Sequence, residues 1–478
     1  MKLKVYADRL SQPSRAVIIF CKVNGIEFEE IEVELIKRQQ FSPEFKAINP
    51  LRKVPAIVDG RFKLFESHAI LIYLTSAFPG VADHWYPADL SSRAKINSVL
   101  SWYHLNLRRG AATFVLHTLL APSLGLRPNQ QAAEEAEKIL SSSLSTIENI
   151  WLKGNGRFLL GGWQPSIADL SLVCEITQLE LLDEKDRDRV LGPHKKVQHW
   201  IESTRNATRP HFDEVHDVLH KLKTKLRMQQ PNPANSETEP RIKATLTSKM
   251  LNGLDFEEIK VDISRRQHLS PEFKEISPMQ KVPAIVHGNF KLIESHAILG
   301  YLASAFPGVA NHWYPTDLFG RAKINSVLDW HHSNLRHGAV TYVINTVLAP
   351  AVGRPLNPKA AAEAEKVLLS SLSKIENIWL NGDGGFLLGG FQPSIADLSL
   401  VCELMQLEVL DEKDRSRILA PYKKVLQWIE NTRTATNPHF DEVHNILYKA
   451  KKKFQDQRSR GANTGTEPNN KMGGLSKM

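Results

Sequence analysis

The fold is best indicated by one segment of the sequence, Lys53-Val54-Pro55-Ala56-Ile57-Val58-Asp59-Gly60 followed by Glu66-Ser67-His68-Ala69-Ile70. The same pattern returns at residues 281–288 and 294–298, at a constant offset of 228 positions. An Asp-Gly pair between two short apolar runs is a strong signal for a β-hairpin. The first occurrence therefore predicts a hairpin that leads directly into a helix, and the second predicts its repeat.

The repeat extends far beyond this stretch. Residues 23–250 align with residues 251–478 without a gap, and most of the aligned residues are identical. Solenoid repeats have units of about 20 to 50 residues, so this period indicates a duplicated protein. The second copy has nothing equivalent to residues 1–22. We call residues 1–250 copy one and residues 251–478 copy two.

Length and composition limit what the chain can be. A chain of 478 residues is too long for one ordinary core, so we expect at least two domains. The hydrophobic content is 42%, yet no apolar run approaches the length that a membrane span needs. The start of the chain alternates apolar and polar residues, as a strand does. We therefore expect neither a membrane partner nor a secretory signal.

The cysteines and the distribution of charge argue against a disulfide-rich, a metal-binding or a nucleic-acid-binding protein. Cys21, Cys174 and Cys402 are few and scattered, so we expect no disulfide framework, no metal site and a reducing compartment. The net charge is +9 and the pI is near 9.2. Much of the excess of basic residues lies at the ends of two predicted helices, at 221–227 and 449–453. Basic residues there favour the helix dipole. We expect no nucleic-acid partner.

The start of copy one alternates strands and helices. Ser11 and Pro13 open a helix that closes at Gly25, and Ser42 opens another. Glu66 to Phe78 forms the last helix of a β-α-β-α-β-β-α module. The predicted strands are near Leu3 to Val5, Phe28 to Val33, Val54 to Val58 and at Lys63-Leu64. This order suits a small mixed sheet.

Long helical periodicity follows. Helices are predicted near residues 90–120, 130–152, 166–182, 195–205 and 212–226. Ser166 and Asp169 form a capping-box pattern, which we interpret as structural. Residues 227–250 and 455–478 are rich in polar residues, glycine and proline, and are predicted to be disordered.

Five motifs carry a resemblance to a known family. They are Leu10-Ser11-Gln12-Pro13-Ser14-Arg15-Ala16-Val17, Arg38-Gln39-Gln40-Phe41-Ser42-Pro43, Asn49-Pro50 with Lys53-Val54-Pro55-Ala56, Glu66-Ser67-His68-Ala69-Ile70, and Ser166-Ile167-Ala168-Asp169. Together they resemble theta-class glutathione transferases, especially plant forms. The resemblance covers copy one from Met1 to about Leu226, and copy two from about Leu251 to Phe454.

The resemblance implies a fold class of α/β plus all-α, duplicated, with a truncated second N-terminal module. The expected domains are a thioredoxin-like glutathione-binding domain at 1–82, an all-α domain at 89–226, a linker at 227–250, a truncated thioredoxin-like domain at 251–310, a second all-α domain at 317–454 and a disordered tail at 455–478. It also implies a homodimer or an intrachain pseudo-dimer.

Ser11 matches the family's catalytic serine. A free thiol has a pKa of about 8.5, and only the thiolate attacks well. A hydroxyl at a helix start, where amide donors also favour an anion, lowers that pKa. The alternatives are Tyr6, which would be the tyrosine of other transferase classes, and Ser14, which we expect to be a surface or packing residue. Ser11 itself could also be a plain N-cap.

The resemblance implies the other glutathione contacts. The Val54 backbone, beside a cis Pro55, would pair with the cysteinyl part of the peptide. Glu66 would face the γ-glutamyl ammonium and Ser67 the carboxylate. The remaining expected contacts are Gln12, Gln40, Phe41 and Lys53, with Lys53 as the cation for the glycyl carboxylate. Arg52 stands where the family usually has glycine, which could alter the rim of the site.

Copy two retains a remnant of this site at His268, Lys281, Val282, Glu294 and Ser295, but nothing matches Ser11. Its missing part includes a strand and a helix with four large apolar side chains. Each such side chain contributes about 1.5 to 3 kcal/mol, so their loss rivals a domain's whole stability of about 5 to 15 kcal/mol. We expect the truncated module to be poorly folded or supported elsewhere, and residues 241–246 could supply a substitute strand.

The predicted function is glutathione conjugation to hydrophobic electrophiles, with reduction of organic hydroperoxides, in detoxification and stress response. Glutathione is a co-substrate, and no cofactor is expected. The alternative is a non-catalytic ligand carrier or scaffold in which copy two serves as an intramolecular dimer partner. A thiol transferase would need cysteine at the position of Ser11. The last residues, Ser476-Lys477-Met478, resemble a peroxisomal address read by an import receptor; cytosol and nucleus are the alternative locations.

Overall fold

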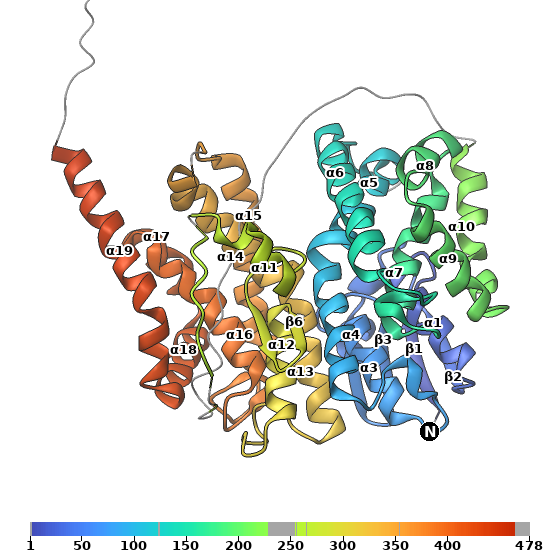
Figure 1. The fold of residues 1–478 in the computed structure, drawn as a ribbon, viewed down its shortest axis with the longest axis horizontal. Helices are drawn as coiled ribbons and strands as arrows, with labels where there is room; N and C mark the ends of the chain where they lie inside the picture. Colours follow the sequence, from blue (N-terminus) through green and yellow to red (C-terminus); the bar gives the residue numbers. More distant parts are fainter. Residues whose placement is uncertain are drawn as a thin grey trace, which may run out of the picture.

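The two copies form two lobes that lie side by side (Figure 1). The computed structural model describes residues 2–122, 125–227, 254, 256–263, 265–352 and 354–463. Three predictions lie outside these residues: most of the linker, the substitute strand at 241–246 and the C-terminal tripeptide 476–478. The predicted fold class, a thioredoxin-like module followed by a helical module in each copy, is confirmed.

The N-terminal module of copy one contains a four-stranded mixed sheet of order β2-β1-β3-β4. β1 pairs in parallel with β2 and antiparallel with β3, and β3 continues through the Asp59-Gly60 turn into β4. The elements are β1 (Leu3–Ala7), α1 (Gln12–Val23), β2 (Phe28–Glu32), η1 (Gln39–Phe41), α2 (Pro43–Ile48), β3 (Ala56–Asp59), β4 (Phe62–Phe65) and α3 (Ser67–Ala77).

Helix α1 is the centre of this module. Ser11 stands at its N-cap with Pro13 in the first turn, and Gly25 follows its end with a φ of 63° that favours glycine. Its residues 14–21 are all buried, because α1 lies between α3 and two helices of the all-α module, α7 (Ile167–Ile176) and α10 (His211–Arg227). The helix therefore joins the two modules of copy one.

The helical module of copy one follows the predicted order with two differences. The predicted helix at 90–120 is interrupted by two π-helical turns, and α8 was not predicted because its sequence is almost entirely polar. The capping box of Ser166 and Asp169 is present. The elements are α4 (Leu90–Tyr103), η3 (His104–Arg108), α5 (Arg109–Val115), η4 (Leu116–Leu120), α6 (Gln130–Thr146), η6 (Ile147–Trp151), α7, η8 (Thr177–Leu181), α8 (Glu184–Leu191), α9 (Lys195–Ala207) and α10.

Copy two repeats this architecture with a reduced N-terminal module. Its elements are η9 (Gln267–Leu269), α11 (Pro271–Ile276), β5 (Ala284–His287), β6 (Phe290–Ile293), α12 (Ser295–Ala305), α13 (Leu318–His331), η10 (His332–Arg336), α14 (His337–Val343), η11 (Ile344–Leu348), η12 (Ala349–Val352), α15 (Pro358–Lys374), η13 (Ile375–Trp379), α16 (Ile395–Leu404), η15 (Met405–Val409), α17 (Glu412–Leu419), α18 (Lys423–Thr436) and α19 (His439–Asn463). The tail predicted to be disordered from residue 455 is thus helical to Asn463, since Gln455 to Arg458 are mostly good helix formers.

The truncated module of copy two is supported by copy one. The β5–β6 hairpin and α12 form an apolar cluster that includes Ala94 of α4. The loss of a neighbouring strand nevertheless shows at Val286, which is 53% exposed. Cys402 is half-buried, whereas its equivalent Cys174 is fully buried beside α1. We expected a module that is either poorly folded or supported elsewhere. The structure shows a module that is supported by copy one.

The two copies pair as an intrachain pseudo-dimer. Helix α3 packs on α13, and α12 packs on α4, so the same contact is made twice (Figure 1). Aromatic pairs extend it: the rings of Phe62 and Phe319 are 4.8 Å apart, and those of Phe65 and Trp379 are 5.6 Å apart. Ile293 of copy two belongs to the apolar core of copy one. Each copy thus occupies the surface on which a second chain would otherwise pair.

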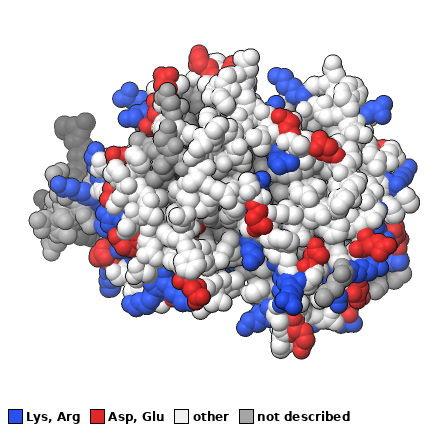
Figure 2. Space-filling model, turned by 90° about the horizontal axis from the view of Figure 1, so that it is seen from below, with Lys and Arg blue, Asp and Glu red and all other residues white. Residues whose placement is uncertain are grey.

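Charged residues of both signs are interspersed over the face in Figure 2, and a broad central area of that face carries few of them. Among the residues that the structure describes, no helix is long and apolar enough to cross a membrane.

Pairing within the chain predicts its mass in solution. Light scattering on the full chain is expected to give 53.9 kDa, independent of concentration, because the pairing surface is already covered. A mass of twice this value would show that the copies pair between chains instead.

Candidate active site

The predicted site residues gather at one end of the four-stranded sheet. Tyr6 near the end of β1 pairs with Ala56 at the start of β3, and Ala56 pairs with Phe65 at the end of β4. The segments that follow β1, precede β3 and follow β4 therefore share this end. They carry Ser11, Val54 and Glu66, in that order.

Ser11 is held at the start of α1 with its hydroxyl uncommitted to the helix. Its backbone N–H donates to the Asp8 carbonyl at 2.9 Å, and its own carbonyl accepts the Arg15 N–H at 3.1 Å. The side chain is 8% exposed and makes no capping hydrogen bond. Ser11 is therefore an N-cap by position only, and its hydroxyl can bond a ligand at the helix N-terminus.

The two alternatives to Ser11 lie elsewhere. The Tyr6 ring packs on Phe45 of α2, with ring centroids 6.2 Å apart, in a cluster that includes Val33 and Ala56. Ser14 is fully buried within α1, and its hydroxyl has no hydrogen-bond partner. Ser14 is thus a packing residue, and not a surface residue.

Arg15 belongs to the motif at residues 10–17, but the motif alone predicts no role for it. Its guanidinium is fully buried and donates to the carbonyls of Arg9 and Leu10, at 2.9 and 3.1 Å. It also donates to the Cys174 carbonyl at 3.1 Å and to Gln178 Oε1 at 2.8 Å. Burial lowers its pKa to about 10, so it remains charged at neutral pH. The sequence signal for this role is an arginine directly before the apolar run from Ala16 to Cys21.

These bonds make Arg15 a positioning residue. They tie the turn that precedes Ser11 to α7 and η8 of the helical module, and they place a buried positive charge one helical turn from the Ser11 position. A cation there favours an anion at the start of α1.

Three further predicted contacts lie in α1 and η1: Gln12 in α1, and Gln40 and Phe41 in η1. Gln12 is the first residue of α1 and is half-buried. Gln40 Oε1 is buried without a hydrogen-bond partner, which leaves an acceptor for a ligand donor. The Phe41 ring is 50% exposed and lies between two guanidinium groups, those of Arg38 at 5.8 Å and Arg52 at 5.9 Å. Arg52 has a φ of 56°, which explains why glycine is usual there.

Lys53 and Val54 lie beside the pairing surface. The Val54-Pro55 peptide bond is cis. Lys53 Nζ reaches Asn334 Oδ1 of copy two at 3.5 Å, and the Lys53 charge acts on Glu66. Copy two therefore borders the site of copy one.

Glu66 and Ser67 begin α3. Glu66 has a φ of 69° and a ψ of 121°, a conformation that L-residues rarely adopt outside functional sites. Burial raises the pKa of its carboxyl to about 7, although the Lys53 charge opposes the shift. Ser67 is the first residue of α3 and is half-buried, so its N–H and hydroxyl are placed to receive an anion.

Copy two reproduces the local geometry of its remnant. The Val282-Pro283 bond is cis, and Glu294 repeats the φ of 69° at the start of α12, where Ser295 is the first residue. Lys281 is half-buried, and His268 is buried in η9. Burial raises the pKa of Glu294, as it does that of Glu66. No residue of copy two corresponds to Ser11, because its sequence begins after that position.

Comparisons with known proteins agree with this arrangement. The sequence profile described as "Glutathione S-transferase, N-terminal domain" matches residues 1–76 and again residues 236–304. The profile "Glutathione S-transferase, C-terminal domain" matches residues 358–431. The N-terminal domain is thus found twice in the chain.

Curated relatives give the class. Glutathione S-transferase T1 of Arabidopsis thaliana is 72% identical over 223 residues, which cover 47% of this chain and 91% of that protein. Glutathione S-transferase theta-1 of Homo sapiens is 40% identical, over 47% of this chain and 91% of its own length. The structure of human glutathione-S-transferase T1-1 in its apo form is 38% identical over 46% of this chain and 91% of its own, with a TM-score of 0.43.

The chain belongs to the glutathione S-transferase family. Its relatives are theta-class members, and the two matches to the N-terminal domain show the duplication.

Replacement of Arg15 tests its positioning role. Arg15→Met leaves buried carbonyls and the Gln178 side chain unpaired, and each such group costs about 1 to 3 kcal/mol. We expect the free energy of unfolding of copy one, measured in urea, to fall by about 3 kcal/mol or more. Arg9→Met is the control: Arg9 pairs with the half-exposed Glu30 and Glu214, and such surface pairs contribute about 0 to 1 kcal/mol. Equal losses in the two variants would contradict the role of Arg15.

Proposed function

We propose that copy one conjugates the thiolate of glutathione to hydrophobic electrophiles, as a detoxifying transferase. The observation that carries this proposal is the Ser11 hydroxyl, which stands at the N-terminus of α1 without a capping bond. Its hydrogen would be donated to the glutathione sulfur. The family membership of the chain supports the same class of reaction.

The free energy needed is within the reach of one such contact. Lowering the pKa of a thiol by about two units requires about 2.7 kcal/mol, and raises its thiolate fraction at neutral pH from a few per cent to a majority. One hydrogen bond to a charged group contributes about 1.5 to 3 kcal/mol. The amides of the first turn of α1 and the Arg15 charge act in the same direction.

The remaining contacts would hold the tripeptide across the end of the sheet. The Val54 backbone would pair with the cysteinyl part as an added strand. Glu66, as a carboxylate, would bind the γ-glutamyl ammonium, and the start of α3 at Ser67 would bind its carboxylate. Lys53, Gln12, Gln40 and Phe41 would face the rest of the peptide. Lys53 Nζ, which contacts Asn334 Oδ1 at 3.5 Å and whose charge acts on Glu66, would supply the cation for the glycyl carboxylate.

The same thiolate would reduce organic hydroperoxides. The sulfur attacks the outer peroxide oxygen, the O–O bond breaks, and an alcohol leaves with a proton from solvent. The glutathione sulfenic acid then condenses with a second glutathione to give the disulfide and water. This reaction needs no group beyond those that conjugation uses.

Replacement of Ser11 tests the proposal. In Ser11→Ala the sulfur loses its donor, so we expect turnover with an aryl halide electrophile to fall about 10- to 100-fold. Binding of glutathione, measured by calorimetry, should persist. Ser14→Ala is the matched control, since the Ser14 hydroxyl has no partner, and its turnover should match the parent. Unchanged turnover in Ser11→Ala would refute the role of Ser11, and no turnover above the uncatalysed rate in the parent would favour the non-catalytic carrier instead.

The pH dependence of binding tests Glu66. S-methylglutathione has no thiol, so its affinity reports on the peptide contacts alone. Because the pKa of Glu66 is raised to about 7, its carboxylate is protonated as the pH falls through that value, and the charge that binds the ammonium is lost. We expect affinity to weaken below about pH 7 and to be stable above about pH 8. Glu66→Gln should bind weakly throughout and show no step near pH 7; a step that survives in this variant would refute the assignment.

A further inference from the structure

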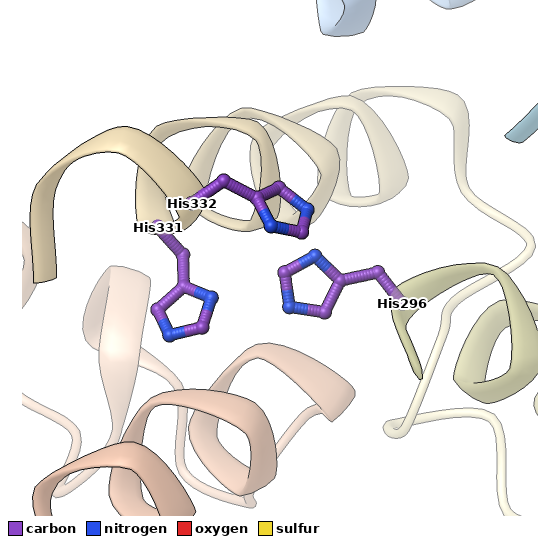
Figure 3. A group of neighbouring side chains, drawn as sticks. All are labelled: His296, His331 and His332. Carbon is purple, nitrogen blue, oxygen red and sulfur yellow. The ribbon is translucent and has the colours of Figure 1, made fainter. Parts of the chain in front are cut away.

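The interface between the two copies buries a group of three histidines in copy two. His296 lies in the first turn of α12, His331 is the last residue of α13, and His332 is the first of η10, and their rings face one another (Figure 3). One ligand nitrogen from each ring lies within 4.8 Å of the other two. The three residues are 7%, 2% and 6% exposed, in that order. Three converging imidazoles form a familiar ligand set for zinc.

His331 is the member of the group whose two ring nitrogens are both buried and have no hydrogen-bond partner. Glu403 Oε2 lies 3.5 Å from His331 Nε2, which is too long for a good hydrogen bond, and it accepts instead from Arg336 at 2.8 Å. Buried polar atoms are almost always paired. A metal ion among the three rings would satisfy one nitrogen of His331.

Copy one shows that this arrangement is not a general consequence of the fold. The position equivalent to His331 is Tyr103, whose hydroxyl donates to Glu175, the equivalent of Glu403. The Tyr103 hydroxyl therefore has a hydrogen-bond partner without a metal ion. The exchange of tyrosine for histidine thus removes a satisfied hydrogen bond from copy two and adds a third imidazole to a pair that both copies possess.

A second group across the interface is built around a carboxylate, and His68 Nδ1 makes its contact there without a hydrogen bond of good geometry. His68 and His104 of copy one both contact the Asp329 carboxylate, His68 Nδ1 at 3.1 Å, and the His104 contact is a short hydrogen bond. Asp329 also accepts from the His68 backbone N–H at 3.3 Å. A carboxylate between two imidazoles explains this group without a metal. It lies next to the first group, since the His104 and His332 rings stack 5.4 Å apart.

Two cavities lie beside the histidines. A cavity of about 50 Å³ is lined by residues of both copies, among them His296 and His332. A larger cavity of about 230 Å³ shares several of its lining residues, including Asn97 and Asn325. The smaller cavity has room for a water molecule beside the imidazoles.

We propose that His296, His331 and His332 bind one zinc ion, with a water molecule from the adjoining cavity as the fourth ligand. Zinc–nitrogen bonds are about 2.0 to 2.1 Å long, so tetrahedral nitrogens lie about 3.4 Å apart, and each ring would move inward by less than about 1 Å. The hydroxyl of Ser399 contacts His296 Nε2 at 2.7 Å and would orient that ring through its second nitrogen. Copper(II) and nickel(II) also accept imidazole, but they favour square-planar or tetragonal geometry, whereas zinc favours a tetrahedral site.

The charge state of the site favours a metal. Burial lowers the pKa of all three histidines, and those of His296 and His332 fall well below the usual value. The rings are therefore neutral at pH 7, which is the form that binds metal. The Asp329 carboxylate acts on His296, whereas Glu403 is already paired with Arg336, whose positive charge acts on all three histidines.

The ion would serve copy two as a structural clamp. In copy one, α3 is held from one side by α1, which copy two lacks. An ion shared by α12 and the α13–η10 junction would fix the equivalent helix α12 to the helical module. This role is independent of glutathione binding in copy one.

Zinc titration of the full chain, after treatment with a chelator, tests the site. We expect calorimetry to show one tight site per chain, and cobalt(II) substitution to give the intense visible bands of tetrahedral coordination. His331→Tyr restores the residue of copy one and should fold, as circular dichroism would verify. This variant is expected to lose affinity for zinc at least about 100-fold, and its thermal midpoint should no longer rise with added zinc. His331→Asn should behave in the same way.

Two further variants locate the ion. Asp329→Ser, again the residue of copy one, removes the carboxylate of the second group and should keep the zinc affinity of the parent. His199→Asn changes an exposed histidine and should also bind as the parent does. Loss of zinc in Asp329→Ser but not in His331→Tyr would place the ion in the second group and overturn the proposal. Equal binding in all variants, or no tight site in the parent, would overturn it as well.

Discussion

The pairing of α3 with α13 and of α12 with α4 is the contact on which the whole molecule depends. It gives the shortened module of copy two an apolar surface to fold against, which its own sequence no longer supplies. It also brings Asn334 of copy two to Lys53 at the edge of the site in copy one. The contact joins two copies of the fold within one chain, so the loss of the first strand and helix of its module does not leave copy two without support.

The site in copy one combines a scaffold with an activating group. The ends of β1, β3 and β4 bring together Ser11, Val54 and Glu66, and buried Arg15 fixes the turn before Ser11 to the helical module. Copy two keeps the scaffold, with its cis Pro283 and the left-handed Glu294, but has no counterpart of the activating group. On the proposed function, the duplication would separate two roles that are joined in copy one: a surface that holds a peptide, and a hydroxyl that makes its thiol reactive.

The fold was largely predictable from sequence because local signals were strong. Helix α1 begins after Ser11 with Pro13 in its first turn and ends before Gly25, and the hairpin turns at Asp59-Gly60. What could not be predicted depends on partners distant in the chain. The bonds of Arg15 reach residues about 160 positions away, and the cluster around His331 joins α12 to α13 only through tertiary packing. The end of α19 was missed because a polar composition was taken to mean disorder, although glutamine and arginine are good helix formers.

The central claim is that one chain carries two scaffolds and a single activated thiol. The most direct measurement is the ultraviolet absorbance of the glutathione thiolate at saturating glutathione and neutral pH, expressed per chain. We expect one thiolate for each 53.9 kDa chain, and none in the Ser11→Ala variant. Two thiolates per chain, or one that survives the loss of Ser11, would contradict it.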